Sequence, residues 1–296
     1  MPSALMHLKQ AVDAAYELFL KKDVPSPRLN AELLLMFALD CDRAYLYAHP
    51  ERPLTAEEQS QYDAVAQERA RGCPTQYITG HQEFWGLDLI VSPAVLIPRP
   101  ETEHVVETVL ELTKQRDPHE RLTLIDVGTG SGCIALALAT ELPLAEIHAC
   151  DISEEALEIA RINAARLLLD NGGLGNRIQF RRSDLLSIYA GAQFDFVISN
   201  PPYVGESEAD KVQRQVREFE PKVAVFSGQE GVDVYKELIP QAHEALHPGG
   251  WLVMEIGFSM EEKIRALLAG WTEVQITADL QGIPRVVAAR KNPHHH

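Results

Sequence analysis

An apolar strand runs directly into a glycine-rich turn in the stretch LTLIDVGTGSG, residues 122–132. The alanine- and leucine-rich segment that follows, residues 133–142, is predicted to form a helix. Glycine accepts positive φ and lets a ligand approach the backbone closely. A strand, a glycine turn and a helix in this order bind ligands at the carboxyl ends of parallel strands. The stretch therefore predicts a parallel α/β sheet with a ligand at the turn; the alternative is a tight structural turn without a ligand.

Short apolar segments alternate with helical ones through the rest of the chain. Such alternation is typical of a mostly parallel sheet that helices cover on both faces. We predict an α/β fold whose strands lie at residues 122–127, 146–151, 177–182, 194–199, 250–256, 272–277 and 284–290.

The N-terminal part has a different pattern, which predicts a small helical bundle. Thr55 and Glu58 have the spacing of a capping box and begin a polar helix that ends near Arg71. Another helix is predicted after Ser26-Pro27, which supplies an N-cap and a first-turn proline. Apolar residues recur there at helical spacing: Leu29, Leu33, Leu34 and Phe37.

The boundary between the two parts is expected near the first cluster of prolines. Residues 84–91 have a strand-like pattern. Residues 92–100 include Pro93, Pro98 and Pro100 and cannot be helical throughout.

Composition excludes several classes of protein. With 46% hydrophobic and 24% charged residues, and no apolar stretch near the ~20 residues of a membrane span, a soluble globular protein with no membrane role is expected. The N-terminus lacks the pattern of a secretory signal. Cysteines without C-x-x-C spacing and histidines without H-E-x-x-H spacing predict free thiols in a reducing cytoplasm and no metal site. A net charge of −16 argues against direct nucleic-acid binding, which normally needs a basic surface.

Two acidic residues follow the second and third strands of the sheet, where they could bind an adenosine. Asp151 could accept hydrogen bonds from both ribose hydroxyls, or it could be the acid that starts the next helix. Asp184 could accept from the adenine amine, with Leu185 on the ring, or it could be a surface turn acid. The glycine spacing is G-x-G-x-G and differs from the G-x-G-x-x-G of dinucleotide folds, so pyrophosphate is not indicated. S-adenosyl-L-methionine fits this pattern.

The tetrapeptide Asn200-Pro201-Pro202-Tyr203 follows the fourth strand. The Asn200 side chain and the Pro201 backbone carbonyl supply two oxygen acceptors beside the aromatic face of Tyr203. Two acceptors beside a ring suit an NH2 group on an sp2 carbon, whose nitrogen is a poor nucleophile and benefits from fixed positioning. The motif predicts methyl transfer to a planar nitrogen, and its alternative is a loop that Asn-Pro-Pro merely initiates.

Along most of its length the chain strongly resembles the bacterial peptide chain release factor glutamine N5-methyltransferases. Ile97–Glu103 is the most discriminating segment, because Asn-Pro-Pro-Tyr is shared with many nucleic-acid amino-methyltransferases. The resemblance implies a seven-stranded, Rossmann-like class I methyltransferase domain preceded by a small helical bundle and a β-hairpin. The matching segments are Tyr77–Gly80, Glu83–Gly86, Val95–Glu103, Asp126–Gly132, Asn200–Tyr203 and Phe219–Pro221.

The resemblance also implies an activity. A methyl group would pass from S-adenosyl-L-methionine to the glutamine of the Gly-Gly-Gln loop in class I release factors, leaving S-adenosyl-L-homocysteine. Asn200, Pro201 and Tyr203 would be catalytic, and with Pro202 they would hold the glutamine. Leu185 stands where some relatives carry tryptophan against adenine. The implied cofactor contacts are Gly128, Thr129, Gly130, Ser131, Gly132, Asp151 and Asn200, to which the residue pattern adds Asp184 and Leu185.

This resemblance divides the chain into four parts. Residues 1–83 would be an N-terminal helical substrate-recognition domain, and residues 84–100 a β-hairpin and proline-rich linker. Residues 101–291 would be the methyltransferase domain. Residues 292–296 would be a tail in which His294–His296 resemble the remnant of a purification tag. A cytoplasmic monomer is expected.

Several alternatives stay open from the sequence. Arg99 reaches toward substrate or cofactor, or it forms a structural salt bridge with Glu101 or Glu103, which we favour. The polar run 206–220 is a solvated helix or a lid that faces the substrate. The substrate alternatives are a ribosomal protein glutamine and an amino group of RNA or DNA, and the acidic charge speaks against the nucleic acids.

Overall fold

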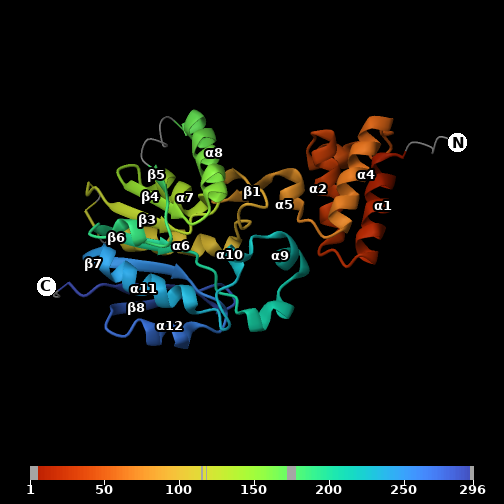
Figure 1. Cartoon of the computed structure of the whole chain (residues 1–296). Helices are drawn as coiled ribbons and strands as arrows, with labels where there is room; N and C mark the ends of the chain where they lie inside the picture. The colour runs from red at the N-terminus through yellow and green to blue at the C-terminus, as the bar shows by residue number, and fades with distance from the viewer. Residues whose placement is uncertain (1–5, 115, 118, 172–177, 294–296) are drawn as a thin grey trace. The chain divides into compact units, whose positions relative to one another are not determined.

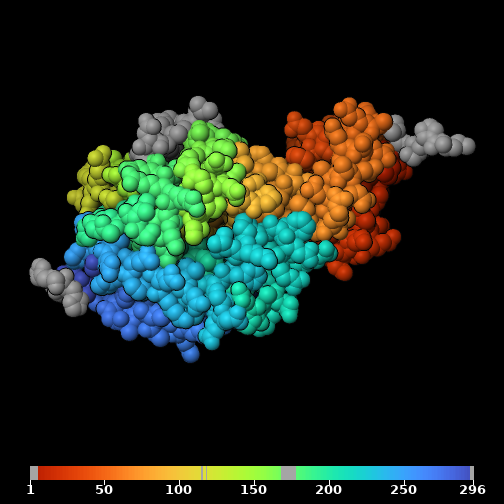
Figure 2. All heavy atoms as spheres, viewed as in Figure 1, coloured from red at the N-terminus to blue at the C-terminus, as the bar shows by residue number. Residues whose placement is uncertain are grey.

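The computed structural model describes residues 6–114, 116–117, 119–171 and 178–293, so the tag-like His294–His296 lie outside the described residues. The chain forms two compact units. One comprises the described residues of Met1–His81 together with Arg214–Phe219, and the other comprises those of Gln82–Gln213 and Glu220–His296. In the space-filling view, side chains fill the spaces between the elements of each unit (Figure 2).

The first unit is a helical bundle with its own apolar core. Phe19, Leu34 and Tyr62 are among its fully buried side chains, and the Tyr62 hydroxyl donates to the Ala31 carbonyl at 3.0 Å. These residues come from three different helices, so the core joins the bundle. Its N-terminal helices are α1 (Leu8–Lys21), α2 (Pro27–Leu39), α3 (Arg43–Ala48), α4 (Ala56–Ala70) and α5 (Thr75–Thr79).

The predicted helices of this unit are confirmed, with two differences in detail. The capping box of Thr55 and Glu58 begins α4 as expected. Ser26 precedes α2, but its side chain makes no capping hydrogen bond. Leu29 and Phe37 are 44% and 47% exposed, because α2 turns a different face, with Ala31, Leu34 and Leu35, toward the core.

The short helix α9 (Arg214–Phe219) belongs to the helical unit although it is distant in sequence. The buried Arg69 guanidinium donates to the Asn30 side chain at 2.9 Å and to the Gln215 side chain at 3.0 Å. The run 206–220 is therefore two short helices, η4 (Glu206–Lys211) and α9, with different surroundings. The alternative of one solvated helix over this run is therefore wrong, because the run is divided and α9 packs on this bundle.

A β-hairpin opens the second unit, with strands β1 (His81–Phe84) and β2 (Leu87–Ile90). The resemblance implies a β-hairpin within residues 84–100, and the hairpin is present but begins at residue 81. The strand-like run 84–91 is interrupted because Trp85 and Gly86 both adopt positive φ and reverse the chain. The fully buried Asn163 side chain anchors β2: it accepts from the Ile90 amide at 2.7 Å and donates to the Ile90 carbonyl at 2.9 Å. It also donates to the Ser131 carbonyl at 3.0 Å, so one amide ties the hairpin to the glycine turn.

Seven strands form the main sheet, in the order β5-β4-β3-β6-β7-β9-β8. The first five strands are parallel to one another, and β9 is antiparallel to both β7 and β8. The predicted strands are confirmed, except that β7 starts at residue 246, with a register shift opposite Phe194–Phe196. The strands are β3 (Thr123–Val127), β4 (Glu146–Asp151), β5 (Ile178–Arg182), β6 (Phe194–Ser199), β7 (Leu246–Glu255), β8 (Thr272–Ala278) and β9 (Pro284–Arg290).

Alternating side chains give the sheet two separate cores. Leu124 and Val253 face one core with α6 (Glu103–Thr113), α7 (Cys133–Glu141) and α8 (Glu154–Asn171). Ile125 and Leu252 face the other with α11 (Asp233–Ala245) and α12 (Glu261–Leu267). Figure 1 shows the two helix layers on opposite sides of the sheet. With both faces covered, a ligand can reach the sheet only at its edges.

Replacing Asn163 with alanine is expected to lower the free energy of unfolding by about 2–4 kcal/mol, because the groups of Ile90 and Ser131 lose their buried partner. Thermal unfolding of the full chain measures the loss. Arg161→Ala on the same helix removes only an exposed pair with Glu154 and should cost less than about 1 kcal/mol. Equal stability of the two variants would contradict the anchoring role.

Candidate active site

Three predicted site segments emerge together at one edge of the sheet. Val127 pairs with Cys150 on β4 and with Ser199 on β6, so β3, β4 and β6 end at the same level. The chain proceeds from β3 to β4 and β5 on one side and returns to β6 on the other. This is the switch point at which doubly wound sheets bind ligands. The glycine turn, Asp151 and Asn200 therefore lie side by side despite their separation in sequence.

The glycines of the turn have two different functions in the fold. Gly128, Gly130 and Gly132 all adopt positive φ, at 72°, 55° and 83°. A Cβ on Gly132 would lie 3.2 Å from the Ala160 side chain, so this glycine allows α7 and α8 to pack closely. A Cβ on Gly128 or Gly130 would meet nothing within 4 Å. These two residues line a cavity and leave their backbone open to a ligand.

Asp151 holds the turn from the end of β4. One carboxylate oxygen accepts from the Gly130 amide at 2.9 Å and the other from the Ser153 amide at 2.9 Å. Burial raises the pKa of Asp151, and the backbone hydrogen bonds from Ser153 and Gly130 oppose that shift. The bond to Ser153 is the local role expected of an acid before α8. The residue also lines the cavity, where its oxygens keep lone pairs for a hydroxyl-bearing ligand.

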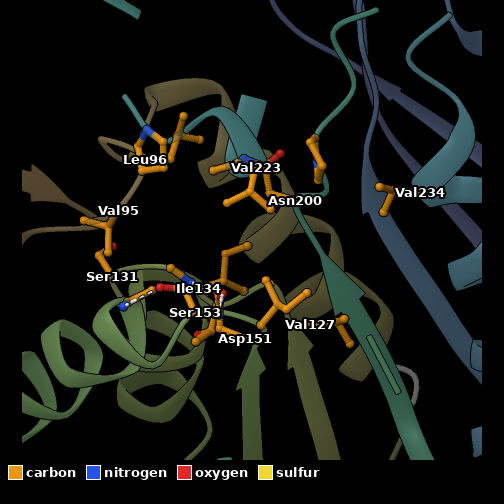
Figure 3. Close-up of a pocket in the computed structure, with 18 of the residues that line it drawn as sticks. Val95, Leu96, Val127, Ser131, Ile134, Asp151, Ser153, Asn200, Val223 and Val234 are labelled. Atoms are coloured by element: carbon orange, nitrogen blue, oxygen red, sulfur yellow. Dashed lines mark hydrogen bonds between the residues drawn. The ribbon is translucent and has the colours of Figure 1, made fainter. Parts of the chain in front are cut away.

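A cavity of about 280 Å³ opens at this edge of the sheet. In Figure 3, Asp151 and Val127 lie near the strand ends, and Leu96 and Val223 lie across the cavity from them. Leu96 comes from the loop after the hairpin, and Val223 from α10 (Lys222–Val225). Of the predicted residues the cavity is lined by Gly128, Thr129, Gly130, Ser131, Asp151, Asp184, Leu185, Asn200 and Pro202, whereas Gly132, Pro201 and Tyr203 are not among the described residues that line it.

The Asn200 loop is tied to a buried carboxyl group. The Asn200 side-chain amide donates to the Thr102 hydroxyl at 3.0 Å, and this hydroxyl donates to the Glu255 carboxylate at 2.6 Å. The Tyr203 hydroxyl is hydrogen-bonded to Glu255 as well. Sequence reasoning missed both partners. Glu255 could have been found from the sequence because it is the single acid at the end of an otherwise apolar strand. The signal for Thr102 was its position within the segment Ile97–Glu103, on which the family resemblance rests most.

Arg99 forms a salt bridge with Glu220, whose side chain is fully buried. The Ile97 amide also donates to Glu220, at 3.3 Å. The structural role favoured for Arg99 is confirmed, but the expected partner was wrong. Glu103 instead accepts from the Trp85 amide, and Glu101 lies 3.9 Å from Arg285. The pair of Arg99 and Glu220 joins the two loops that wall the cavity.

Two buried carboxyl groups have strongly shifted acidities. Burial raises the pKa of Asp126 to about 7, against the effect of hydrogen bonds from Thr129 and Ala135. Burial likewise raises the pKa of Glu255 to about 7, against hydrogen bonds from Thr102 and Tyr203. One oxygen of Asp126 is buried without a hydrogen-bond partner among the described residues. The charged forms of both groups are therefore disfavoured in the folded protein.

The pKa of Asp126 is higher in the folded than in the unfolded protein, so its protonated carboxyl group stabilises the fold. This contribution to the free energy of unfolding is fully present below the unfolded-state pKa of Asp126 and is lost as pH rises through about 7. Between about pH 5 and pH 8 we expect wild-type protein to lose on the order of 3 kcal/mol relative to Asp126→Asn, which cannot ionise. Thermal unfolding across this range, without ligand, measures the difference. Parallel pH profiles of the two proteins would show that Asp126 titrates normally.

The described residues restrict other kinds of site. Among them, no group of three or more histidine, cysteine, aspartate or glutamate side chains could hold a metal ion. The four cysteines are free thiols. Within the described part of the chain, no helix has the length and apolar character that crossing a membrane would require.

The fold and the site define a class I methyltransferase with a helical N-terminal domain. The family described as PrmC N-terminal domain matches residues 10–80, and the family described as methyltransferase small domain matches residues 107–219. The chain belongs to the release factor glutamine methyltransferase family.

Relatives along nearly the whole chain support this membership. A release factor glutamine methyltransferase of Koribacter versatilis is 58% identical over 288 residues, which are 97% of this chain and 99% of the relative. One of Xylella fastidiosa is 43% identical over 265 residues, or 89% and 93% of the two chains. The solved hMettl16 catalytic domain in complex with MAT2A 3'UTR hairpin 6 has a TM-score of 0.55 at 19% identity, covering 78% of this chain and 82% of that one. At this identity the likeness concerns the fold alone.

Proposed function

We propose that this protein transfers a methyl group from S-adenosyl-L-methionine to the side-chain amide nitrogen of the Gly-Gly-Gln glutamine in class I release factors. This modification would modulate translation termination. The observation that carries the proposal is the 58% identity to a release factor glutamine methyltransferase over 97% of the chain, with Asn200 at the cavity. A cytoplasmic monomer that recognises its protein substrate through the helical unit is part of the same proposal.

The cavity suits S-adenosyl-L-methionine. The open space above Gly128 and Gly130 admits a ligand against the backbone. Asp151 would accept from the ribose hydroxyls and the exposed Asp184 from the adenine amine, with Leu185 against the ring. Gly132 would contribute by holding the turn in place. When bound, the cofactor supplies a methyl group on a positively charged sulfur.

The chain's own residues would position the glutamine amide, whose delocalised lone pair makes it a weak nucleophile. The Asn200 side-chain oxygen and the Pro201 carbonyl would accept its two N–H groups and aim the nitrogen, while Pro202 and Tyr203 support the loop. As the N–C bond forms and the methyl–sulfur bond breaks, the amide protons become more acidic, so both acceptors bind more strongly in the transition state. The proton lost from nitrogen passes to solvent.

The direct test is incubation of the protein with methyl-labelled S-adenosyl-L-methionine and a class I release factor. Label is expected on the Gly-Gly-Gln glutamine and should vanish when that glutamine is replaced by alanine. Asn200→Ala should lower kcat at least ~100-fold because an acceptor is lost. Mass spectrometry locates the label. Label only on a ribosomal protein or on nucleic acid would overturn the proposal.

Gly130→Ala should weaken S-adenosyl-L-methionine binding at least ~10-fold, because the new methyl group enters ligand space and the residue is strained at positive φ. Gly282→Ala is the matched control, since Gly282 also has positive φ and nothing within 4 Å, but lies outside the cavity lining. Calorimetric titration measures both affinities. Unchanged affinity in Gly130→Ala would place the cofactor elsewhere.

A further inference from the structure

Three side chains from separate elements form a continuous chain of hydrogen bonds at the cavity, which Thr102 and Asn200 line. Glu255 ends β7, Thr102 precedes α6, and Asn200 follows β6. Ser199 pairs with Met254, so Asn200 and Glu255 are the next residues on neighbouring strands. Glu255 and Thr102 are only 2% and 1% exposed. Water therefore has little access to the bonds between them.

The donor and acceptor chemistry gives this chain a direction. An ionised carboxylate can only accept, so the single hydroxyl hydrogen of Thr102 must point to Glu255. The Thr102 oxygen is then left as an acceptor, and it can bind Asn200 only through the NH2 end of the amide. The oxygen end of the Asn200 side chain consequently faces away from Thr102. Free rotation of this amide would otherwise present either end to a substrate.

We propose that Thr102 and Glu255 are positioning residues that hold Asn200 with its oxygen turned toward the substrate amide. This inference rests on the proposed function, because a substrate NH2 group is what requires an acceptor there. A protonated Glu255 could donate to Thr102, which could in turn donate to the Asn200 oxygen. The NH2 group of Asn200 would then meet the NH2 group of the substrate, and two donors do not bond.

Thr102→Val tests the chain because valine matches threonine in shape and lacks the hydroxyl. We expect kcat toward the release factor to fall about 10- to 100-fold, while the Kd of S-adenosyl-L-methionine and the Tm change little. Thr102→Ser restores a hydroxyl and should recover most of the rate. Thr108→Val, on the following helix, removes a hydroxyl whose partners among the described residues are the His104 carbonyl and Thr277, and it should behave as wild type.

The outcomes separate this inference from the proposed function. If wild-type protein labels the glutamine and Thr102→Val keeps its full kcat, the positioning role is overturned and the function stands. A Thr102→Ser variant as slow as Thr102→Val also overturns it, because the hydroxyl would then not be the active feature. If wild-type protein places no label on the glutamine, the proposed function itself is overturned.

Glu255→Gln gives a second readout, because glutamine can donate to Thr102 and does not ionise. Wild-type kcat should rise with pH through about 7, as burial raises the pKa of Glu255 to about 7, and this limb should be missing in Glu255→Gln. An unchanged pH limb in the variant overturns the inference. The titratable and hydrogen-bonding groups that face Glu255 are Glu101 and Thr102 before α6, Cys133 on α7, Tyr203, Tyr235 on α11 and Arg285 on β9.

Discussion

The parallel pairing of β3 with β4 on one side and β6 on the other is the constraint on which the site depends. Val127, Cys150 and Ser199 stand at one level, so each following residue starts from the same edge. Helices cover both faces of the sheet and leave that edge as the accessible route to a ligand. The glycine turn, Asp151 and the Asn200 loop therefore become neighbours through strand register alone.

Buried acids at the strand ends hold these loops in shape. Asp126 on β3 accepts from Thr129 in the glycine turn, and Glu255 on β7 accepts from Thr102 behind the Asn200 loop. Both acids are partnered mainly by hydroxyl and backbone groups, which leaves their charged forms costly. Such groups are retained at a cost in stability at neutral pH. When ionised, each of these carboxylates can only accept hydrogen bonds, and it therefore orients every donor that contacts it.

The segment after the hairpin serves several parts of the site at once. Leu96 lines the cavity, Arg99 pairs with the buried Glu220, and Thr102 orients Asn200. Glu220 lies shortly before Val223 in the sequence, and Val223 lines the cavity wall. A change in this segment would reach both the cavity wall and the Asn200 loop.

The sequence by itself determined the strands, the glycine turn, the capped helix at Thr55 and the family, because periodicity and turn chemistry act over a few residues. It did not show that Thr102, 98 residues from Asn200 and 153 from Glu255, joins the two. Nor did it show that Asn163 anchors Ile90, 73 residues away, or that Glu220 is the partner of Arg99. Only the packing of helices on the sheet decides which distant polar groups meet away from water. Local sequence patterns do not indicate which distant polar groups come into contact, so the tertiary structure alone decided how the Asn200 amide is held.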